Sequence, residues 1–446
     1  MLALPLLVAA LLPAQEKVDL AAMHRIRTEA FNHSGVMDHA FYMSEVYGPR
    51  LTGSPGLKAA GEWAARQFTQ WGLANTAMEK WGPFGRGWTS TKFNASLKEP
   101  QYAPLIGFAR PWSPGTSGPV AGQPVLATIA TEADFDKYRG KLKGKIVLLG
   151  APRQLALQTS APAKVLSDAD LASESLALAR SISGDYVGSA VAPPGPAGGV
   201  RPPSRAAQER FRHKLNDYLT KEGAALAIIA GDRTDGGTVR ATAAGSRDPK
   251  DPLPVPSVAL TPEHYNRIAR LIEKKLPVTL EFDIENKFLD DNKDSFNVVA
   301  ELPGTDKKDE VVMLGAHMDS WTGGTGATDN AAGSSVVMEA MRILKATGLK
   351  PRRTVRAALW TGEEQGLLGS KAYIKAHFAD VEMMALKPEQ KKLAAYFNMD
   401  NGAGRIRGVY LQGNDMVRPI FEAWLAPFKD LGATALSIRN TTGTDH

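Results

Sequence analysis

Residues 311–333, VVMLGAHMDSWTGGTGATDNAAG, contain an apolar run, a polar turn rich in glycine, and the start of an amphipathic segment. The run at 311–316 is short, apolar and rich in residues that favour β structure, so it predicts a buried strand. From 331 to about 346, apolar residues recur at the spacing of one helix face. The order strand, turn and helix predicts one unit of an α/β sheet.

The same alternation continues on both sides of this unit. Further strands are predicted at 296–302, 354–360, 393–398 and 408–411, and a further helix near 367–377. Strands that alternate with helices are typical of an α/β fold, in which helices cover a central sheet.

Residues of the types that commonly bind metal ions follow three of these strands at the point where each strand ends. They are His317 with Asp319, Glu363 with Glu364, and Asp400. Asp329 stands in the turn before the helix predicted to begin at 331. Because the carboxyl ends of strands form the ligand crevice of open α/β sheets, we expect these side chains to lie close together.

Each of these residues also has an ordinary structural interpretation. His317 beside Asp319 is also what a plain surface pair looks like, and Asp329 suits the cap of a helix. Glu363 and Glu364 suit the acid-rich start of a helix, and Asp400 in Asp-Asn-Gly suits a turn.

Taken together, the set favours metal chemistry over four independent turns. An imidazole is a common metal ligand, and a carboxylate two residues on can orient its ring. Two adjacent glutamates repel each other unless a cation holds one of them, and they could serve as one ligand and one general base. With no cysteine in the chain, the pattern predicts a hydrolytic two-metal centre rather than a structural zinc site.

Composition restricts the other function classes. The 446 residues carry a formal net charge of +6, but the basic residues are scattered and form no stripe, so nucleic-acid binding is not indicated. Residues 1–15, MLALPLLVAALLPAQ, are too short to span a membrane and suit the core of a signal peptide. A buried N-terminal segment or a misplaced start are the alternatives, because this stretch lacks Lys and Arg.

The middle of the chain has a different character. From about residue 119, strands are predicted at 145–149, 224–230, 256–260 and 278–283, without the regular alternation with helices. Residues 192–203, APPGPAGGVRPP, have the composition of an exposed loop. We therefore interpret residues 119–286 as a separate β-rich domain.

The stretches GAHMDSW at 315–321, GATDNAAG at 326–333, WTGEEQG at 360–366 and FNMD at 397–400 resemble the co-catalytic zinc exopeptidases. This family includes bacterial secreted aminopeptidases, glutamate carboxypeptidase II and carboxypeptidase Q, and the resemblance is strongest to the carboxypeptidase Q type. The stretches at 142–147, 222–225 and 253–258 resemble a protease-associated domain.

The resemblance implies a mixed central sheet flanked by helices, an inserted protease-associated domain, and two Zn²⁺ ions. His317 and Asp400 would bind one ion, and Glu364 would bind the second. Asp329 would bridge both ions, and the peptide bond that joins it to Asn330 would be cis. Glu363 would be the general base for the water between the ions, and Asp319 would orient His317.

The resemblance also implies an organisation and a function. Residues 1–15 would be a signal peptide, 19–118 the first part of the peptidase domain, 119–286 the insertion, and 287–446 the catalytic part. The protein would be a secreted or periplasmic exopeptidase that hydrolyses short peptides, either from the amino or from the carboxyl end, with a homodimer as one option. A receptor that has lost catalysis is the alternative, although it predicts missing ligands.

One ligand of the family has no clear counterpart. The second zinc usually takes a further histidine near the C-terminus, and here the sequence ends Gly443-Thr444-Asp445-His446. His446 is one candidate. We instead expect this ligand beyond His446, because several relatives carry it some tens of residues after the corresponding Asp.

Overall fold

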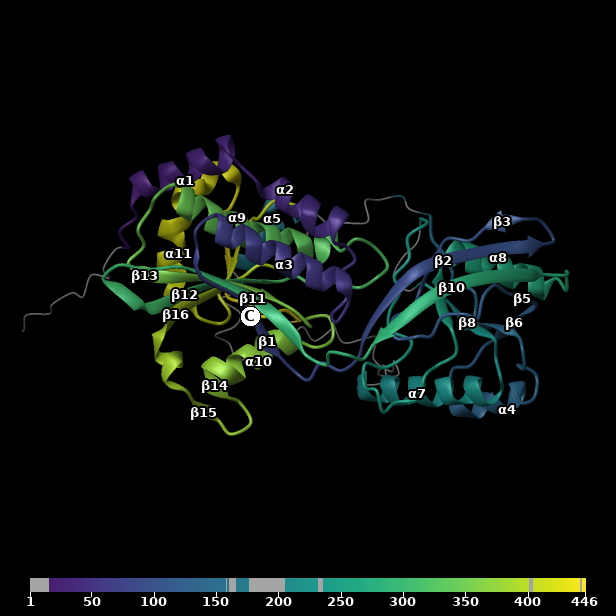
Figure 1. The fold of residues 1–446 in the computed structure, drawn as a ribbon. Helices are drawn as coiled ribbons and strands as arrows, with labels where there is room; N and C mark the ends of the chain where they lie inside the picture. Colours follow the sequence, from purple (N-terminus) through teal and green to yellow (C-terminus); the bar gives the residue numbers. More distant parts are fainter. Residues whose placement is uncertain are drawn as a thin grey trace, which may run out of the picture. The chain divides into compact units, whose positions relative to one another are not determined.

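The computed structural model describes residues 16–157, 159, 166–175, 205–231, 236–400, 404–441 and 443–446 (Figure 1). The predicted signal peptide at 1–15 and the whole loop at 192–203 lie outside these residues. The chain divides into two compact units. The first comprises residues 1–32, 158–199 and 403–443, and the second comprises 33–157, 200–402 and 444–446.

The second unit contains a five-stranded sheet in the order β1-β11-β13-β12-β16. Its strands are β1 (Ala74–Trp81), β11 (Ser295–Leu302), β13 (Arg353–Trp360), β12 (Lys307–His317) and β16 (Leu393–Asn398). β1 and β13 run antiparallel to β11, whereas β12 runs parallel to both β13 and β16. The predicted mixed α/β sheet is therefore confirmed, and the carboxyl ends of β12, β13 and β16 share one edge.

Helices cover both faces of this sheet, as Figure 1 shows. On one face, α3 (Pro55–Gln70) and α9 (Ala332–Ala346) bury apolar residues such as Phe68 and Met338 against Val298, Ala357 and Leu359. On the other face, Tyr373 of α10 (Leu368–His377) packs against Val299, Met313 and Trp360. Because successive strand residues point to opposite faces, strands buried on both sides read as continuous apolar runs.

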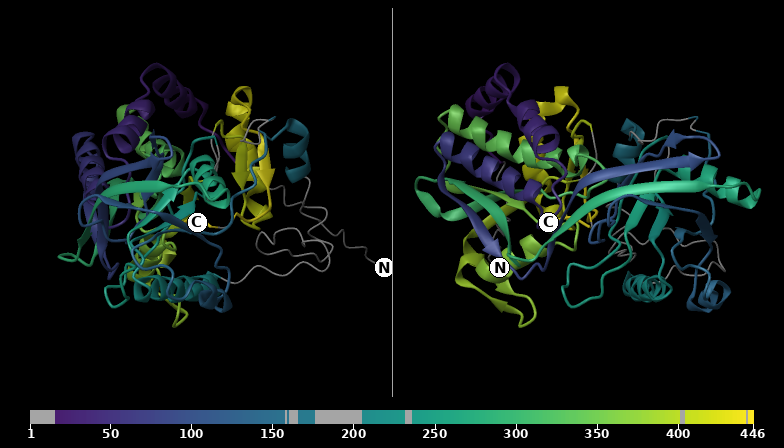
Figure 2. Two further views of the ribbon diagram at one scale, coloured as in Figure 1. Left: turned by 90° about the vertical axis from the view of Figure 1, so that its right-hand side faces the viewer. Right: turned by 45° about the vertical axis from the view of Figure 1, so that its right-hand side comes forward.

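Two further sheets of the second unit lie between Gly87 and Leu289 in sequence. One has the order β3-β2-β10-β5, and the other the order β4-β9-β8-β7-β6. Their strands are β2 (Gly87–Glu99), β3 (Ala103–Pro104), β4 (Gly107–Ala109), β5 (Val120–Gly122), β6 (Pro124–Ala127), β7 (Ile146–Leu149), β8 (Leu226–Ala230), β9 (Ser257–Leu260) and β10 (Thr279–Leu289). The long antiparallel ribbon of β2 and β10 is visible in both views of Figure 2. The strand β2, which pairs with β10, begins at Gly87, before the predicted boundary at 119. The domain boundaries at 119 and 286 stay a prediction.

The β4-β9-β8-β7-β6 sheet is also buried on both faces. Ile146 and Leu148 of β7 pack with Phe282 of β10 and with Tyr265 of α8 (Pro262–Glu273). Val147 points the other way, toward Leu219 of α7 (Arg205–Lys221) and the partly buried Phe135 and Tyr138 of α4 (Phe135–Tyr138).

The first unit contains α1 (Leu20–Asn32), α5 (Asp168–Ser175), β17 (Gly408–Tyr410), α11 (Arg418–Leu425) and β18 (Ala435–Ser437). The strand predicted at 408–411 is present, and it pairs in parallel with β18. Arg27 of α1 forms a salt bridge with Asp430 at 2.6 Å between Nη2 and Oδ2.

The remaining elements of the second unit are short. They are α2 (Val36–Phe41), β14 (Ala379–Asp380) and β15 (Ala385–Leu386), besides several single turns of 3₁₀ or π helix. None of the helices in the described ranges combines the length and apolarity that crossing a bilayer requires.

Phe68 offers a test of the packing between α3 and the central sheet. Its side chain is fully buried, so Phe68→Ala should lower the free energy of unfolding by about 3–5 kcal/mol, through lost burial and the cavity left behind. Arg66→Ala, at an exposed position of the same helix, should change it by less than about 0.5 kcal/mol. Urea denaturation followed by circular dichroism measures both, and equal midpoints for the two variants would contradict this packing.

Candidate metal centre

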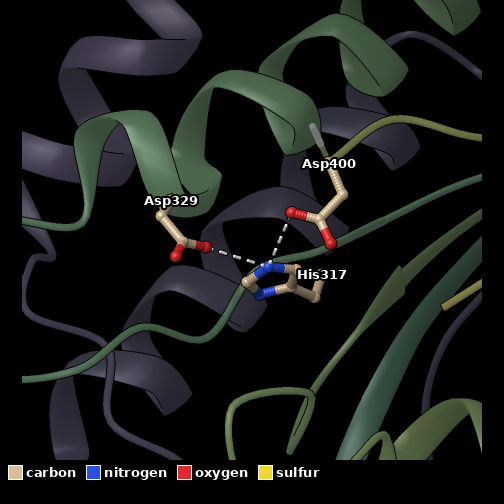
Figure 3. Close-up of side chains that lie close together, drawn as sticks. All are labelled: His317, Asp329 and Asp400. Atoms are coloured by element: carbon tan, nitrogen blue, oxygen red, sulfur yellow. Dashed lines mark ion pairs between the residues drawn. The ribbon is translucent and has the colours of Figure 1, made fainter. Parts of the chain in front are cut away.

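Three of the predicted site residues converge at the shared edge of the central sheet. His317 ends β12 and is buried, with Nε2 3.1 Å from Asp329 Oδ1 and 3.3 Å from Asp400 Oδ1 (Figure 3). One ligand atom from each residue lies within 4.8 Å of the other two. An imidazole nitrogen and two carboxylate oxygens at this spacing can hold one metal ion.

Asp329 is not a helix cap. It has extended dihedral angles (φ −119°, ψ 96°) in the short element η3 (Ala327–Ala331), whereas the N-cap position of α9 is Ala331. The peptide bond from Asp329 to Asn330 is cis, as the resemblance implies. The Asn330 side chain accepts from Gly333 N at 2.9 Å and donates to Met399 O at 3.0 Å. Asn330 therefore ties the start of α9 to the residue before Asp400.

Asp319 connects two strand ends. Its carboxylate is fully buried and accepts hydrogen bonds from the backbone N–H of Glu363 (3.2 Å) and of Glu364 (3.3 Å). It also accepts from Thr52 Oγ1 at 3.0 Å. The Nδ1 atom of His317 lies 3.1 Å from the Asp319 backbone carbonyl but 3.6 Å from the carboxylate. The carboxylate thus positions the glutamates more directly than it orients the imidazole.

Glu363 and Glu364 lie in the turn between β13 and α10. Glu363 Oε2 is 3.9 Å from His317 Nε2. Burial, together with neighbouring carboxylates, raises the pKa of Glu363 to about 8 and that of Glu364 to about 8. Burial opposes the charged form of His317, but the surrounding carboxylates hold its pKa well above the usual range. The site is therefore a partly buried cluster of acids that a bound cation would stabilise.

Sequence reasoning missed the segment before α3. Arg50 is fully buried, and its guanidinium donates to the backbone carbonyls of Met43, Met318, Thr325 and Gly326. Thr52 donates to Asp319 and accepts from Gly362 N at 3.0 Å. This segment holds the loop that follows His317. No local motif marked it, because its partners apart from Met43 lie more than 260 positions away in sequence.

Asp445 is a second residue that sequence reasoning did not assign. It is buried, and Ser370 Oγ donates to its Oδ1, while Oδ2 has no hydrogen-bond partner among the described residues. Burial raises its pKa to about 7, and the charges of Asp319 and Asp400 act in the same direction. Both side-chain polar atoms of Gln365 are also buried without a partner in this part of the chain. Such orphaned groups beside an acidic cluster fit a site that receives a ligand.

The C-terminal residues are held by a chain of hydrogen bonds from the sheet. Trp360 Nε1 donates to Tyr396 OH at 2.7 Å, and Tyr396 donates to Asn398 Oδ1 at 2.9 Å. Asn398 Nδ2 then donates to Thr444 Oγ1 at 3.0 Å. His446 is exposed, with Nδ1 2.7 Å from Thr444 Oγ1, and it is outside the His317, Asp329 and Asp400 group found among the described residues.

Comparisons with known proteins indicate the class of protein to which this chain is similar. Residues 297–444 match the model of Peptidase family M28. The chain is 24% identical to Carboxypeptidase Q of Mus musculus over 437 residues, which are 97% of this chain and 77% of that protein.

Two solved structures are similar in fold. A Peptidase M28 precursor from Shewanella amazonensis superposes with a TM-score of 0.61 at 23% identity, covering 96% of this chain and 84% of that one. A zinc aminopeptidase from Bacillus subtilis superposes with a TM-score of 0.52 at 18% identity, covering 92% and 80%. The fold and these comparisons define a peptide hydrolase. The part of the chain that carries the site, residues 297–444, is the part that matches Peptidase family M28.

The raised pKa values predict how the metal-free protein responds to pH. Glu363 and Glu364 release their protons near pH 8 when folded but near their ordinary pKa of 4.5 when unfolded. The contribution of these two glutamates to the free energy of unfolding is therefore fully present below about pH 4.5 and is lost as the pH rises toward 8. The raised pKa of His317 acts in the same direction above its ordinary pKa of 6.5.

We therefore expect the melting temperature in excess chelator to fall between about pH 5 and about pH 8. Saturating zinc should flatten this dependence, because the ion stabilises the ionised carboxylates. Differential scanning fluorimetry checks both series. A melting temperature that rises over this range in chelator would contradict the description of the acidic cluster.

Thr52 offers a test of how far the hydrogen bonds behind the site contribute to zinc affinity. Thr52→Val keeps the shape but removes the hydrogen bonds to Asp319 and Gly362, so zinc should bind about 10- to 100-fold more weakly. Thr69→Val, which removes an exposed hydroxyl from α3, is the matched control and should leave affinity unchanged. Competition with a chromogenic chelator measures the affinities, and equal values for the two variants would exclude this role of Thr52.

Proposed function

We propose that this protein is a zinc-dependent exopeptidase that hydrolyses short peptides outside the cytoplasm. The observation that carries the proposal is the convergence of His317, Asp329 and Asp400 beside the Glu363–Glu364 turn. The match of residues 297–444 to Peptidase family M28 and the similarity to a Carboxypeptidase Q support the reaction class. The composition of residues 1–15 supports a secreted or periplasmic location.

The donor set fits two zinc ions. His317 and Asp400 would hold one ion, and Glu364 would hold the second together with a further ligand. Asp329 would offer a carboxylate oxygen to each. When bound, zinc polarises the scissile carbonyl and makes water a stronger nucleophile at neutral pH. The nitrogen and oxygen donors without thiolate are those that hydrolytic zinc sites use.

Glu363 would act as the general base. Its position one residue before Glu364 keeps it at the site while leaving its carboxylate for proton transfer. It would take a proton from the attacking water and deliver it to the leaving amine. Asp319 holds the backbone N–H of Glu363, so the direction of this side chain depends on a fully buried anchor.

Glu363→Gln separates catalysis from metal binding. The amide keeps the size of the side chain but cannot accept the proton, so kcat for a short peptide should fall by about 10²–10⁴-fold while zinc content is retained. His317→Ala should lose both zinc and activity, and Glu62→Gln on the exposed side of α3 should lose neither. Metal analysis and peptide hydrolysis measure the two properties on the same samples.

Two outcomes would count against the proposal. Full activity of the wild-type protein after exhaustive chelation would exclude a zinc mechanism. Unchanged activity of Glu363→Gln would exclude Glu363 as the base while leaving the metal site intact.

A further inference from the structure

The hairpin formed by β14 and β15 exposes a run of large apolar side chains. In Figure 1 it extends beyond the end of α10, away from the central sheet. All six residues from 381 to 386 are exposed. Four of them are large and apolar, with exposed fractions from 67% to 86%: Val381, Met383, Met384 and Leu386. Contiguous exposed apolar surface of this kind marks a site of interaction with a protein or a membrane.

Hydrogen bonds within the hairpin fix the backbone of its tip. Both residues of β14 pair with both residues of β15. The Asp380 carboxylate accepts from the backbone N–H groups of Glu382 and Met383, each at 3.1 Å. At the base, Lys387 N donates to Phe378 O at 2.8 Å, and the Phe378 ring packs against the core beneath α10. The backbone therefore presents the apolar side chains to solvent in a defined arrangement.

The acidic side chains near the tip already have partners. Glu382 Oε2 lies 3.8 Å from Lys375 Nζ, and Asp380 accepts the two backbone hydrogen bonds at the tip. Glu389 Oε2 lies 3.2 Å from His377 Nδ1. These carboxylates are therefore engaged inside the protein rather than available to a partner.

Two cations beside the hairpin remain available. Lys391 and Lys392 end the short element η4 (Pro388–Lys392) and are exposed. Neither forms a hydrogen bond or an ion pair with any residue in the described ranges. Lys392 lines the same cavity as Phe378, which places it at the base of the hairpin. An apolar tip with lysines behind it is the arrangement that binds anionic lipid surfaces, because the tip enters the acyl boundary while the ammonium groups reach the phosphates.

A second copy of this chain is the alternative occupant, and the charges disfavour it. In a two-fold dimer one patch meets the same patch of the other copy, so contact through the hairpin would bring Lys391 and Lys392 toward their own counterparts. Like charges in such positions repel each other. A stable dimer also buries about 20–30 residues on each partner, whereas the tip of the hairpin exposes six.

We propose that the β14–β15 hairpin inserts into the surface of a membrane that contains anionic lipids. The six residues of the tip are exposed together, which suits immersion in a fluid apolar layer better than contact with one face of a protein. Lys391 and Lys392 bind the lipid phosphates. The hairpin precedes the amino end of β16, and the candidate metal centre lies at the carboxyl end of that strand. Membrane binding thus leaves the centre at the opposite edge of the sheet, and it does not depend on peptidase activity.

Co-sedimentation of the full chain with lipid vesicles tests this binding. One set of vesicles is made of equal parts phosphatidylcholine and phosphatidylglycerol, and the other of phosphatidylcholine alone. Wild type should sediment with the mixed vesicles and only weakly with phosphatidylcholine. Added salt should weaken binding to the mixed vesicles, because it screens the attraction between the lysines and the lipid phosphates.

Two double variants separate the apolar contribution from the charged one. Met383→Ser combined with Met384→Ser should lower partition onto the mixed vesicles by about 10- to 100-fold, because two apolar side chains no longer leave water. Lys391→Gln combined with Lys392→Gln should lower it by about 30-fold, since each lysine near an anionic surface contributes about fivefold. The lysine variant should bind phosphatidylcholine vesicles as wild type does.

Matched controls remove the same groups elsewhere. Met37→Ser combined with Met416→Ser removes two methionines that are 76% and 87% exposed, against 76% and 86% for Met383 and Met384. Lys274→Gln combined with Lys275→Gln removes an adjacent exposed pair that follows α8. Both controls should bind the mixed vesicles as wild type does. Unchanged melting temperatures verify that all four variants are folded.

Three outcomes would overturn the proposal. The first is a wild type that sediments with neither set of vesicles, which would leave a protein partner as the occupant of the hairpin. The second is undiminished binding by the variant that lacks Met383 and Met384. The third is a dimer that the same variant dissociates in analytical ultracentrifugation without lipid, because a second copy would then cover the tip.

Discussion

The buried carboxylate of Asp319 is the interaction on which the arrangement of the site depends. A charge without access to water is costly unless donors surround it, and here the donors come from Thr52 and from the backbone of Glu363 and Glu364. The same hydrogen bonds that offset this cost join the end of β12 to the end of β13 and to the segment before α3. Moving any one of these three parts would leave the carboxylate without some of its hydrogen-bond donors. The three parts therefore keep one mutual geometry.

The parallel register of β12, β13 and β16 brings further side chains to the edge of the sheet where Asp319 lies. His317 lies opposite Trp360, and Gly315 lies opposite Asn398, so the residues that follow β13 and β16 leave the sheet beside the imidazole. Acids delivered to one edge in this way repel each other, and burial raises the pKa values of Glu363, Glu364 and Asp445. The backbone thus holds these acidic side chains closer together than their mutual repulsion favours. A bound cation relieves that repulsion, which couples metal binding to the stability of this edge.

The predicted strands and helices of the catalytic part agree with the structure because each is a short apolar run with a definite period. The grouping of His317, Asp329 and Asp400 could also be predicted, since strand ends of one sheet meet at one edge. The roles of Arg50, Thr52 and Asp445 could not be predicted. Each reaches the site from a segment distant in sequence, and its role lies in partners that no local pattern reveals. The helix-cap interpretation of Asp329 was excluded only by the structure, in which the N-cap position of α9 is Ala331.

The connection between β1 and β11 has a consequence for how the chain folds. These neighbours are paired up to Trp81 and Ser295, yet all the residues from 82 to 294 lie between them. Closing so long a loop costs conformational entropy that a simple hairpin would not. The intervening residues form their own sheets and core, and β2 and β10 run side by side from Gly87 and Leu289. Once that ribbon has formed, the two ends are already neighbours. In the folded protein, the middle of the chain therefore holds the end of β1 and the start of β11 close together, as the turn of a hairpin would.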